Sequence, residues 1–216
     1  MMNILFLQLL MSTMFLTLVS LHLTKKNFIA TVSYAIQSSV IVLILLNSFF
    51  ETKNIYIFIV ILATLIVKVI LAPLFFNRLI KKNAVVFSAS TYLNAPLMLI
   101  IIAALTFIAN SQKLTPLTGI VPGNQVLLSL ALSSILLSLF LIINRKGALS
   151  QILGILSLEN SILAFAIFAG LEQSIGLQIG VVFDIFIWII IAFMFMSMVY
   201  KHFGSHDVTS MKNLKD

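Results

Sequence analysis

The chain has 216 residues, of which 61% are hydrophobic and only 9% charged, with a formal net charge of +7. Soluble domains carry about 25% charged residues, so this composition excludes an ordinary soluble enzyme and predicts an all-α, polytopic membrane helix bundle. The apolar runs are continuous rather than alternating, which argues against a transmembrane β-barrel. Cysteine is absent, so the chain offers no thiolates for a metal or iron–sulfur site, and we expect no cofactor.

Seven apolar segments of about membrane-spanning length follow one another along the chain. They cover about residues 3–23, 28–50, 55–76, 84–110, 121–143, 148–170 and 176–200. A polar tail, residues 201–216, follows the last of them. We therefore expect about seven transmembrane helices and an aqueous C-terminal tail.

The positive charges predict an orientation. Ten cations lie in the loops after the first, third, fifth and seventh segments, namely Lys25, Lys26, Arg78, Lys81, Lys82, Arg145, Lys146, Lys201, Lys212 and Lys215. The opposite loops contain only Lys53 and Lys113. Cytoplasmic loops are enriched in Lys and Arg, so the pattern predicts an N-terminus outside and a C-terminus inside. This distribution also accounts for the net charge without nucleic-acid binding.

Proline and glycine divide the chain. Pro73 and Pro96 fall inside the third and fourth segments, where each removes one helical hydrogen bond. Such kinks serve either packing or function, and the sequence leaves both open. A loop over residues 115–123 contains two prolines and two glycines. It suggests a four-helix part (1–113), a connecting loop (114–123), a three-helix part (124–200) and a cytoplasmic tail (201–216).

Three ionisable residues lie within the predicted spans: Lys68, Glu159 and Asp184. At 1.5 Å per residue, Glu159 lies ~16 Å below the inner face, Asp184 ~12 Å and Lys68 ~20 Å from the outer face. All three depths are compatible with one midplane layer. A charge at that depth costs roughly 2.5–3.5 kcal/mol or more, so each residue is a candidate for an ion pathway.

Helical geometry separates two faces of the segment around Glu159. A stripe of small residues suits close packing against the fifth segment, which carries several serines: Gly147, Ser150, Gly154, Ser157, Ser161 and Ala164. Glu159 points away from this stripe, onto an otherwise apolar face, and Asn160 lies about 100° round the helix. The carboxylate must therefore stay protonated or meet a charge from another helix or subunit.

Each of the other two residues has two interpretations. Lys68 is either a charge partner of Glu159 or a side chain that snorkels to the inner interface. Asp184 is either a relay group or a helix-packing hydrogen bond. His22, His202 and His206 lack the spacing of a metal site, and the sequence contains no recognisable catalytic motif.

Short motifs carry a resemblance to a known family. The segment RKGALSQILGILSLEN at Arg145–Asn160 resembles the second helix of the K-type subunit of respiratory complex I. Together with GVVFDI at 180–185 and the terminal SMKNLKD, it resembles component E of hydrogenase-4-type membrane complexes over the whole chain. The family commonly has an acid just before the IGVVFD stretch, whereas this chain has Gln178, which argues against a second outer carboxylate there.

The resemblance implies a non-catalytic membrane subunit of a redox-linked ion pump, with antiporter-like subunits as partners in the inner cell membrane. Glu159 would exchange the proton or cation, Asp184 would relay it, Lys68 would tune Glu159, and Asn160 and Gln178 would be supporting polar groups. Two alternatives stay open: an independent secondary transporter, and a purely structural assembly subunit.

Overall fold

The computed structural model describes residues 3–82 and 91–171, together with the single positions Phe186, Ile190, Phe193, Met194 and Ser197. The described chain forms α1 (Ile4–Leu23), α2 (Asn27–Thr52), α3 (Ile55–Thr64), a π-helix (Leu65–Leu71), α4 (Ala72–Lys82), α5 (Ala95–Ala109), α6 (Thr115–Thr118), α7 (Gln125–Asn144) and α8 (Ala148–Phe168), with short 3₁₀ turns at Gln112–Leu114 and Pro122–Asn124. These helices confirm the all-α prediction.

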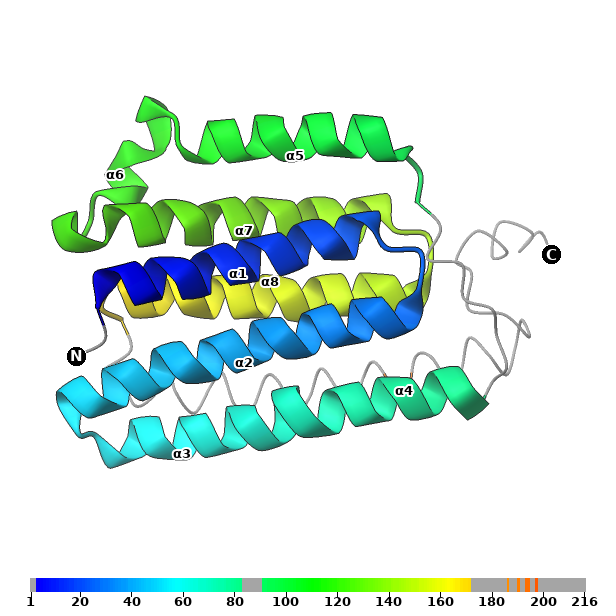
Figure 1. Cartoon of the computed structure of the whole chain (residues 1–216), viewed down its shortest axis with the longest axis horizontal. Coiled ribbons are helices and arrows are strands. Elements are labelled where there is room, and N and C mark those ends of the chain that lie inside the picture. The colour runs from blue at the N-terminus through cyan, green and yellow to red at the C-terminus, as the bar shows by residue number, and fades with distance from the viewer. Residues whose placement is uncertain are drawn as a thin grey trace.

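The long helices lie side by side as one bundle (Figure 1). Helix α1 packs against α2 and α7, and α8 packs against α7 and α2. Helix α5 lies on one side of this group, against α7, and the α3–α4 pair lies on the other, against α2. The first four and the later predicted segments therefore contact each other directly, and the division into two parts stays a prediction.

Five described helices are long and apolar enough to cross a membrane: Ile4–Leu23, Asn27–Thr52, Ile55–Arg78, Pro122–Asn144 and Leu149–Phe168. A sixth span is obtained if α5 and the short helices after it, which bend by 52°, count as one. The predicted seventh segment, 176–200, lies outside the continuously described residues. The count of about seven therefore stays a prediction.

Asparagine marks three of the helix starts. The side chains of Asn3, Asn54 and Asn94 accept hydrogen bonds from backbone N–H groups in the first turn of α1, α3 and α5. Asparagine is a preferred N-cap because its oxygen satisfies donors that have no partner within the helix.

Within the fourth predicted segment, the described residues begin at Thr91 and form a helix only from Ala95. Residues 91–94 are not helical, and α5 begins at Ala95 with Pro96 in its first turn. Pro96 therefore lies in a helix, but the prediction that it removes a helical hydrogen bond is wrong, because a proline in the first turn removes none. The predicted loop over 115–123 also contains the short helix α6.

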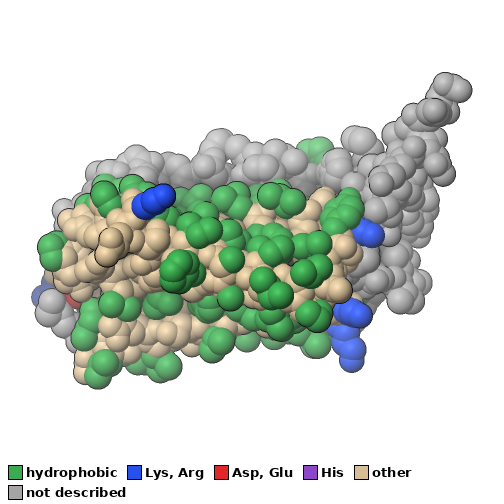
Figure 2. All heavy atoms as spheres, turned by 90° about the horizontal axis from the view of Figure 1, so that it is seen from above, with side chains coloured by type: hydrophobic (Ala, Val, Ile, Leu, Met, Phe, Trp, Pro, Cys, Tyr) green, Lys and Arg blue, Asp and Glu red, His purple; other side chains and the backbone are tan. Residues whose placement is uncertain are grey.

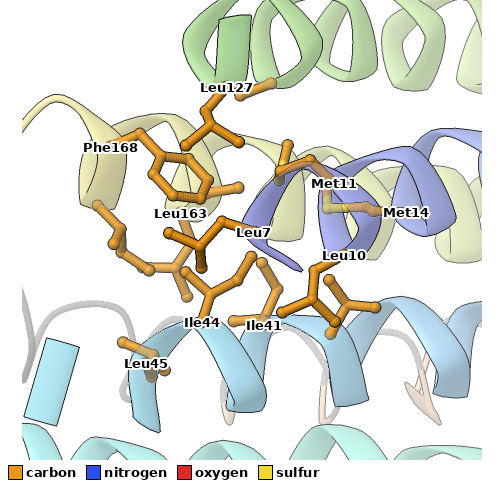
Figure 3. Close-up of a cluster of buried hydrophobic side chains, with 14 of the residues drawn as sticks. Leu7, Leu10, Met11, Met14, Ile41, Ile44, Leu45, Leu127, Leu163 and Phe168 are labelled. Atoms are coloured by element: carbon orange, nitrogen blue, oxygen red, sulfur yellow. The ribbon is translucent and has the colours of Figure 1, made fainter. Parts of the chain in front are cut away.

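Two apolar clusters fill the bundle. The first joins α1, α2, α3, α7 and α8, with Leu7, Met11, Ile41, Leu127 and Leu163 among its members (Figure 3). The second joins α1, α2, α4, α7 and α8 and includes aromatic rings from α2 and α4. Its members are Leu18, Leu21, Ala30, Tyr34, Ala72, Phe76, Leu141, Leu149, Leu153 and Leu156.

The outer surface is also apolar. Hydrophobic side chains cover much of the face shown in Figure 2, and the Lys and Arg side chains visible there lie toward its ends. In Phe107 and Ile143, 78% and 73% of the residue surface is exposed. Such exposure suits contact with lipid or with another membrane subunit.

Most of the described Lys and Arg residues lie at one end of the bundle. The α1–α2 turn, the C-terminal part of α4 and the α7–α8 turn lie at one end, which we name the basic end. Its described cations are Lys25, Lys26, Arg78, Arg145 and Lys146. The α2–α3 turn with Lys53 and the segment with Lys113 lie at the opposite end.

Candidate functional site: a buried Lys68–Glu159 ion pair

Lys68 lies in a break in the third span. Residues Leu65–Leu71 form a π-helix, and the α-helix resumes at Ala72, next to Pro73. Pro73 has no N–H to continue the regular ladder, and the backbone N–H of Ala72 instead bonds the carbonyl of Val67. Widened turns of this kind change the direction of side chains and occur frequently at functional sites.

The Lys68 side chain turns into the bundle. It is fully buried, and its Nζ atom lies 3.1 Å from Oε1 of Glu159 on α8. Of the two interpretations of Lys68, the structure shows the ion pair and not a side chain that extends to the interface.

Asn160 completes the surroundings of the ammonium group. Lys68 Nζ donates a hydrogen bond of 2.9 Å to Oδ1 of Asn160, and Asn160 Nδ2 donates one of 3.2 Å to Oγ of Ser38 on α2. One ammonium group thus holds two consecutive residues of α8 that lie about 100° apart on the helix. The chain of polar contacts runs from α8 through the third span to α2.

The two side chains of the pair differ in exposure, although their charged atoms are both buried. The Lys68 side chain has no accessible surface, whereas 19% of the Glu159 side chain is accessible. Mutual attraction and the bond to Asn160 offset part of the cost of burying the ammonium, which is several kcal/mol for a single ion. Both carboxylate oxygens of Glu159 are nevertheless buried, so the accessible part of this side chain is its aliphatic stem.

The small-residue stripe of α8 holds Glu159 in register. Gly154 lies so close to α7 that a Cβ atom there would be 2.9 Å from Cγ1 of Ile142, and Ser161 Oγ lies 3.4 Å from Ser138 Oγ. Ser157, Ser161 and Ala164 are fully buried. Because this face of α8 packs against α7, the side of the helix with Glu159 and Asn160 faces α2 and the third span.

Two further predicted residues cannot be placed. Asp184 and Gln178 lie outside the described residues, so their roles stay predictions. Among the described residues, no group of three or more His, Asp or Glu side chains forms a candidate metal site.

Arg145 has a role that its place in a basic loop did not indicate. The residue is buried, and its guanidinium donates to the carbonyls of Leu21, His22 and Thr24 at the end of α1. Burial lowers the pKa of Arg145 to about 10, so the group is still protonated at neutral pH. A guanidinium at carbonyls with no helical partner is a favourable helix C-terminal contact.

His22 is the second buried polar residue of this region that sequence reasoning passed over. Its Nε2 atom lies 3.0 Å from the carbonyl oxygen of Leu137, and its ring stacks on Phe140 with centroids 5.0 Å apart. Both contacts join α1 to α7, more than a hundred residues away. The sequence contains a weak indication of these roles, since His22 lies within the first apolar segment and Arg145 lies directly between the fifth and sixth segments.

Comparison with known proteins finds similar chains of one name. The chain is 30% identical over 193 residues to hydrogenase-4 component E of Escherichia coli (strain K12), and the match covers 84% of each chain. The same values hold for the proteins of that name from Escherichia coli O157:H7 and Shigella flexneri. No family model and no solved structure matches. The chain belongs to the hydrogenase-4 component E family.

Proposed function

We propose that the protein is a membrane subunit of a hydrogenase-4-type, complex I-like assembly, in which the Lys68–Glu159 pair takes part in moving protons across the membrane. Family membership supports the assembly. The single observation that carries the ion-translocation role is the buried ion pair, 3.1 Å between Nζ and Oε1, in the middle of a membrane bundle.

The chemistry proposed for the pair follows from the cost of isolated charge. While Lys68 faces Glu159, the carboxylate is stabilised without a proton. If Lys68 moves away, an unpaired carboxylate in apolar surroundings costs several kcal/mol, and uptake of a proton relieves that cost. Return of Lys68 favours release. Proton binding is thus coupled to the geometry of the π-helix that carries Lys68.

The partners and setting of this cycle are part of the same proposal. Antiporter-like membrane subunits would contact the exposed apolar faces, and a peripheral redox enzyme would drive the movement. The assembly would lie in the inner cell membrane. The chain itself would have no catalytic site, and Asp184 would serve as an access or relay group beyond Glu159.

Replacement of Glu159 tests the proposal. We expect Glu159→Gln to leave the complex assembled and to reduce redox-driven proton uptake into vesicles by about a hundredfold, the lower range for loss of a proton-transferring group. The matched control is Glu51→Gln at the exposed end of α2, which removes the same charge and should leave uptake unchanged.

Two outcomes would contradict the proposal. Normal coupling in the assembled Glu159→Gln complex would remove the translocating role. Loss of assembly in Glu159→Gln, with normal assembly in Glu51→Gln, would favour a structural subunit. Co-purification in mild detergent separates both from an independent transporter, which would be active alone.

A further inference from the structure

Helix α2 carries a stripe of buried polar side chains. Asn27, Thr31, Tyr34 and Ser38 are spaced by four, three and four residues, which places them on one face of the helix. At most 6% of each residue is exposed. The four residues span ~16 Å along the helix axis. We name them the α2 polar stripe.

The stripe begins at the basic end and ends at the ion pair. Asn27 is the first residue of α2, directly after Lys26. Ser38, its last member, accepts the hydrogen bond from Asn160, which in turn accepts from Lys68. Tyr34 lies one helical turn before Ser38 on the same face, and it belongs to the apolar cluster that includes Leu156 of α8.

Beyond Ser38 the same face of α2 becomes apolar. The positions that continue the stripe are Ile41, Val42 and Leu45, and all three are buried in the first cluster. No described polar side chain of α2 therefore extends this face from the ion pair toward the opposite end until Ser48 is reached. Along this face of α2, polar side chains therefore reach the level of the pair from the basic end, whereas the side chains immediately beyond the pair are apolar.

Apolar side chains enclose the stripe. Leu149, Leu153 and Leu156 of α8 and Phe76 of α4 belong to the same cluster as Tyr34, and the rings of Tyr34 and Phe76 meet edge to face at 6.5 Å between centroids. The stripe is thus screened from lipid by the bundle itself.

Several polar atoms in this region have no hydrogen-bond partner within the described protein. They are Oδ1 of Asn27 and both amide atoms of Gln37, in residues at least nine-tenths buried. Buried polar atoms are nearly always bonded to protein or water. Successive groups of the stripe are about one helical turn apart, a gap that one or two water molecules bridge.

We propose that the α2 polar stripe is a one-sided access route, along which water and protons reach the Lys68–Glu159 pair from the basic end of the bundle. The use of the route by protons rests on the proposed function. The existence and direction of the route do not depend on the proposed function. A pair that is reached from one side in this way needs a second, separate group to pass the proton onward.

Single cysteines measure access along the stripe. Because the natural chain contains no cysteine, it gives no background signal of its own. The variants are Thr31→Cys and Ser38→Cys on the stripe and Leu45→Cys beyond the ion pair. The intact complex in sealed vesicles receives Ag⁺ on one side in chloride-free buffer, and thiols that remain are labelled with a maleimide after denaturation.

We expect Ag⁺ from the side of the basic end to block positions 31 and 38 at least about tenfold faster than Ag⁺ from the other side, because an ion does not cross apolar protein readily. Position 45 should stay unblocked from both sides over the same time. Equal rates from both sides, no reaction at 31 and 38, or reaction at 45 from the opposite side would each overturn the proposal.

Removal of one hydroxyl measures proton flow. We expect Ser38→Ala to slow redox-driven proton uptake about fivefold, the effect of one lost hydrogen bond. The matched control is Ser39→Ala, since Ser39 lies next in the chain but bonds the carbonyl of Ala35 within its own helix. Equal rates in the two variants would contradict a proton route through Ser38.

The experiments can reject either proposal without rejecting the other. If Glu159→Gln keeps normal coupling while positions 31 and 38 react only from the basic end, the route stands and the proposed function fails. If Glu159→Gln loses coupling while positions 31 and 38 are inert to Ag⁺, the function stands and the route is wrong.

Discussion

At the scale of single residues, the Lys68–Glu159 pair is expensive for stability and therefore informative about function. Apolar residues of similar volume in place of a buried ion pair are often neutral or stabilising, whereas loss of one partner is strongly destabilising. The pair lies 3.1 Å apart with one fully buried member. A bundle that needed only stability would be served as well by leucine and methionine at these positions.

A pair of substitutions separates stability from function. We expect Lys68→Met alone to lower the free energy of unfolding by roughly 3–5 kcal/mol, because it leaves the Glu159 carboxylate without its ammonium. The double variant Lys68→Met/Glu159→Leu should recover most of this loss. Thermal unfolding of the detergent-solubilised complex measures both effects.

Proton coupling, unlike stability, should not recover in the double variant. Redox-driven proton uptake should be lost in the single and in the double variant, since neither retains an exchangeable pair. A double variant that is stable and still couples normally would contradict the role of the pair.

At the scale of secondary-structure elements, the contact between α7 and α8 determines where Glu159 points. A Cβ atom at Gly154 would lie 2.9 Å from Cγ1 of Ile142 and 3.3 Å from its backbone nitrogen. The helices approach this closely because the facing residues are small, as in other membrane helix pairs. A larger residue would push α8 away and displace Glu159 from Lys68.

Gly154→Val tests this dependence. We expect a loss of about 1–3 kcal/mol from overpacking, measured as a lower unfolding temperature, and a matching loss of coupling. The control is Gly123→Val, because a Cβ atom at Gly123 meets nothing within 4 Å. Unchanged stability in Gly154→Val would mean that the two helices adjust freely and do not orient Glu159.

At the scale of the whole molecule, charge separates the two ends of the bundle. The basic end contains the described cations of three loops, while the opposite end has Lys53 and Lys113. Arg145 also joins the α7–α8 turn to the end of α1 at this end of the bundle, through hydrogen bonds to the carbonyls of His22 and Thr24. The positive-inside rule predicts that the basic end faces the cytoplasm, with the N-terminus outside.

Exposed loop positions measure this orientation. We expect Lys53→Cys to react with a membrane-impermeant maleimide in intact cells, and Lys25→Cys to react only in inside-out vesicles. Both side chains lie in exposed turns, so the two variants differ in side and not in burial. The reverse pattern would invert the predicted topology and the direction of the α2 route.

The sequence by itself determined the class of protein, most helix positions and the identity of the costly residues. Continuous apolar segments predict spanning helices because lipid cannot satisfy an open backbone. The small-residue stripe of α8 followed from helical periodicity alone, as did the isolation of Glu159 from it. Pro96 was misplaced because a proline near the start of a helix and one inside it look alike when the boundary is uncertain by several residues.

Only the tertiary structure decided which charges meet. Lys68 and Asn160 are 92 residues apart in the chain, and periodicity shows which face a residue occupies but not which helix lies opposite. The π-helix before Pro73 turns Lys68 inward, and the contact of α2 with α8 brings Ser38 to Asn160. The burial of Arg145 likewise depends on the end of α1 lying beside the α7–α8 turn, a long-range contact that no local pattern encodes.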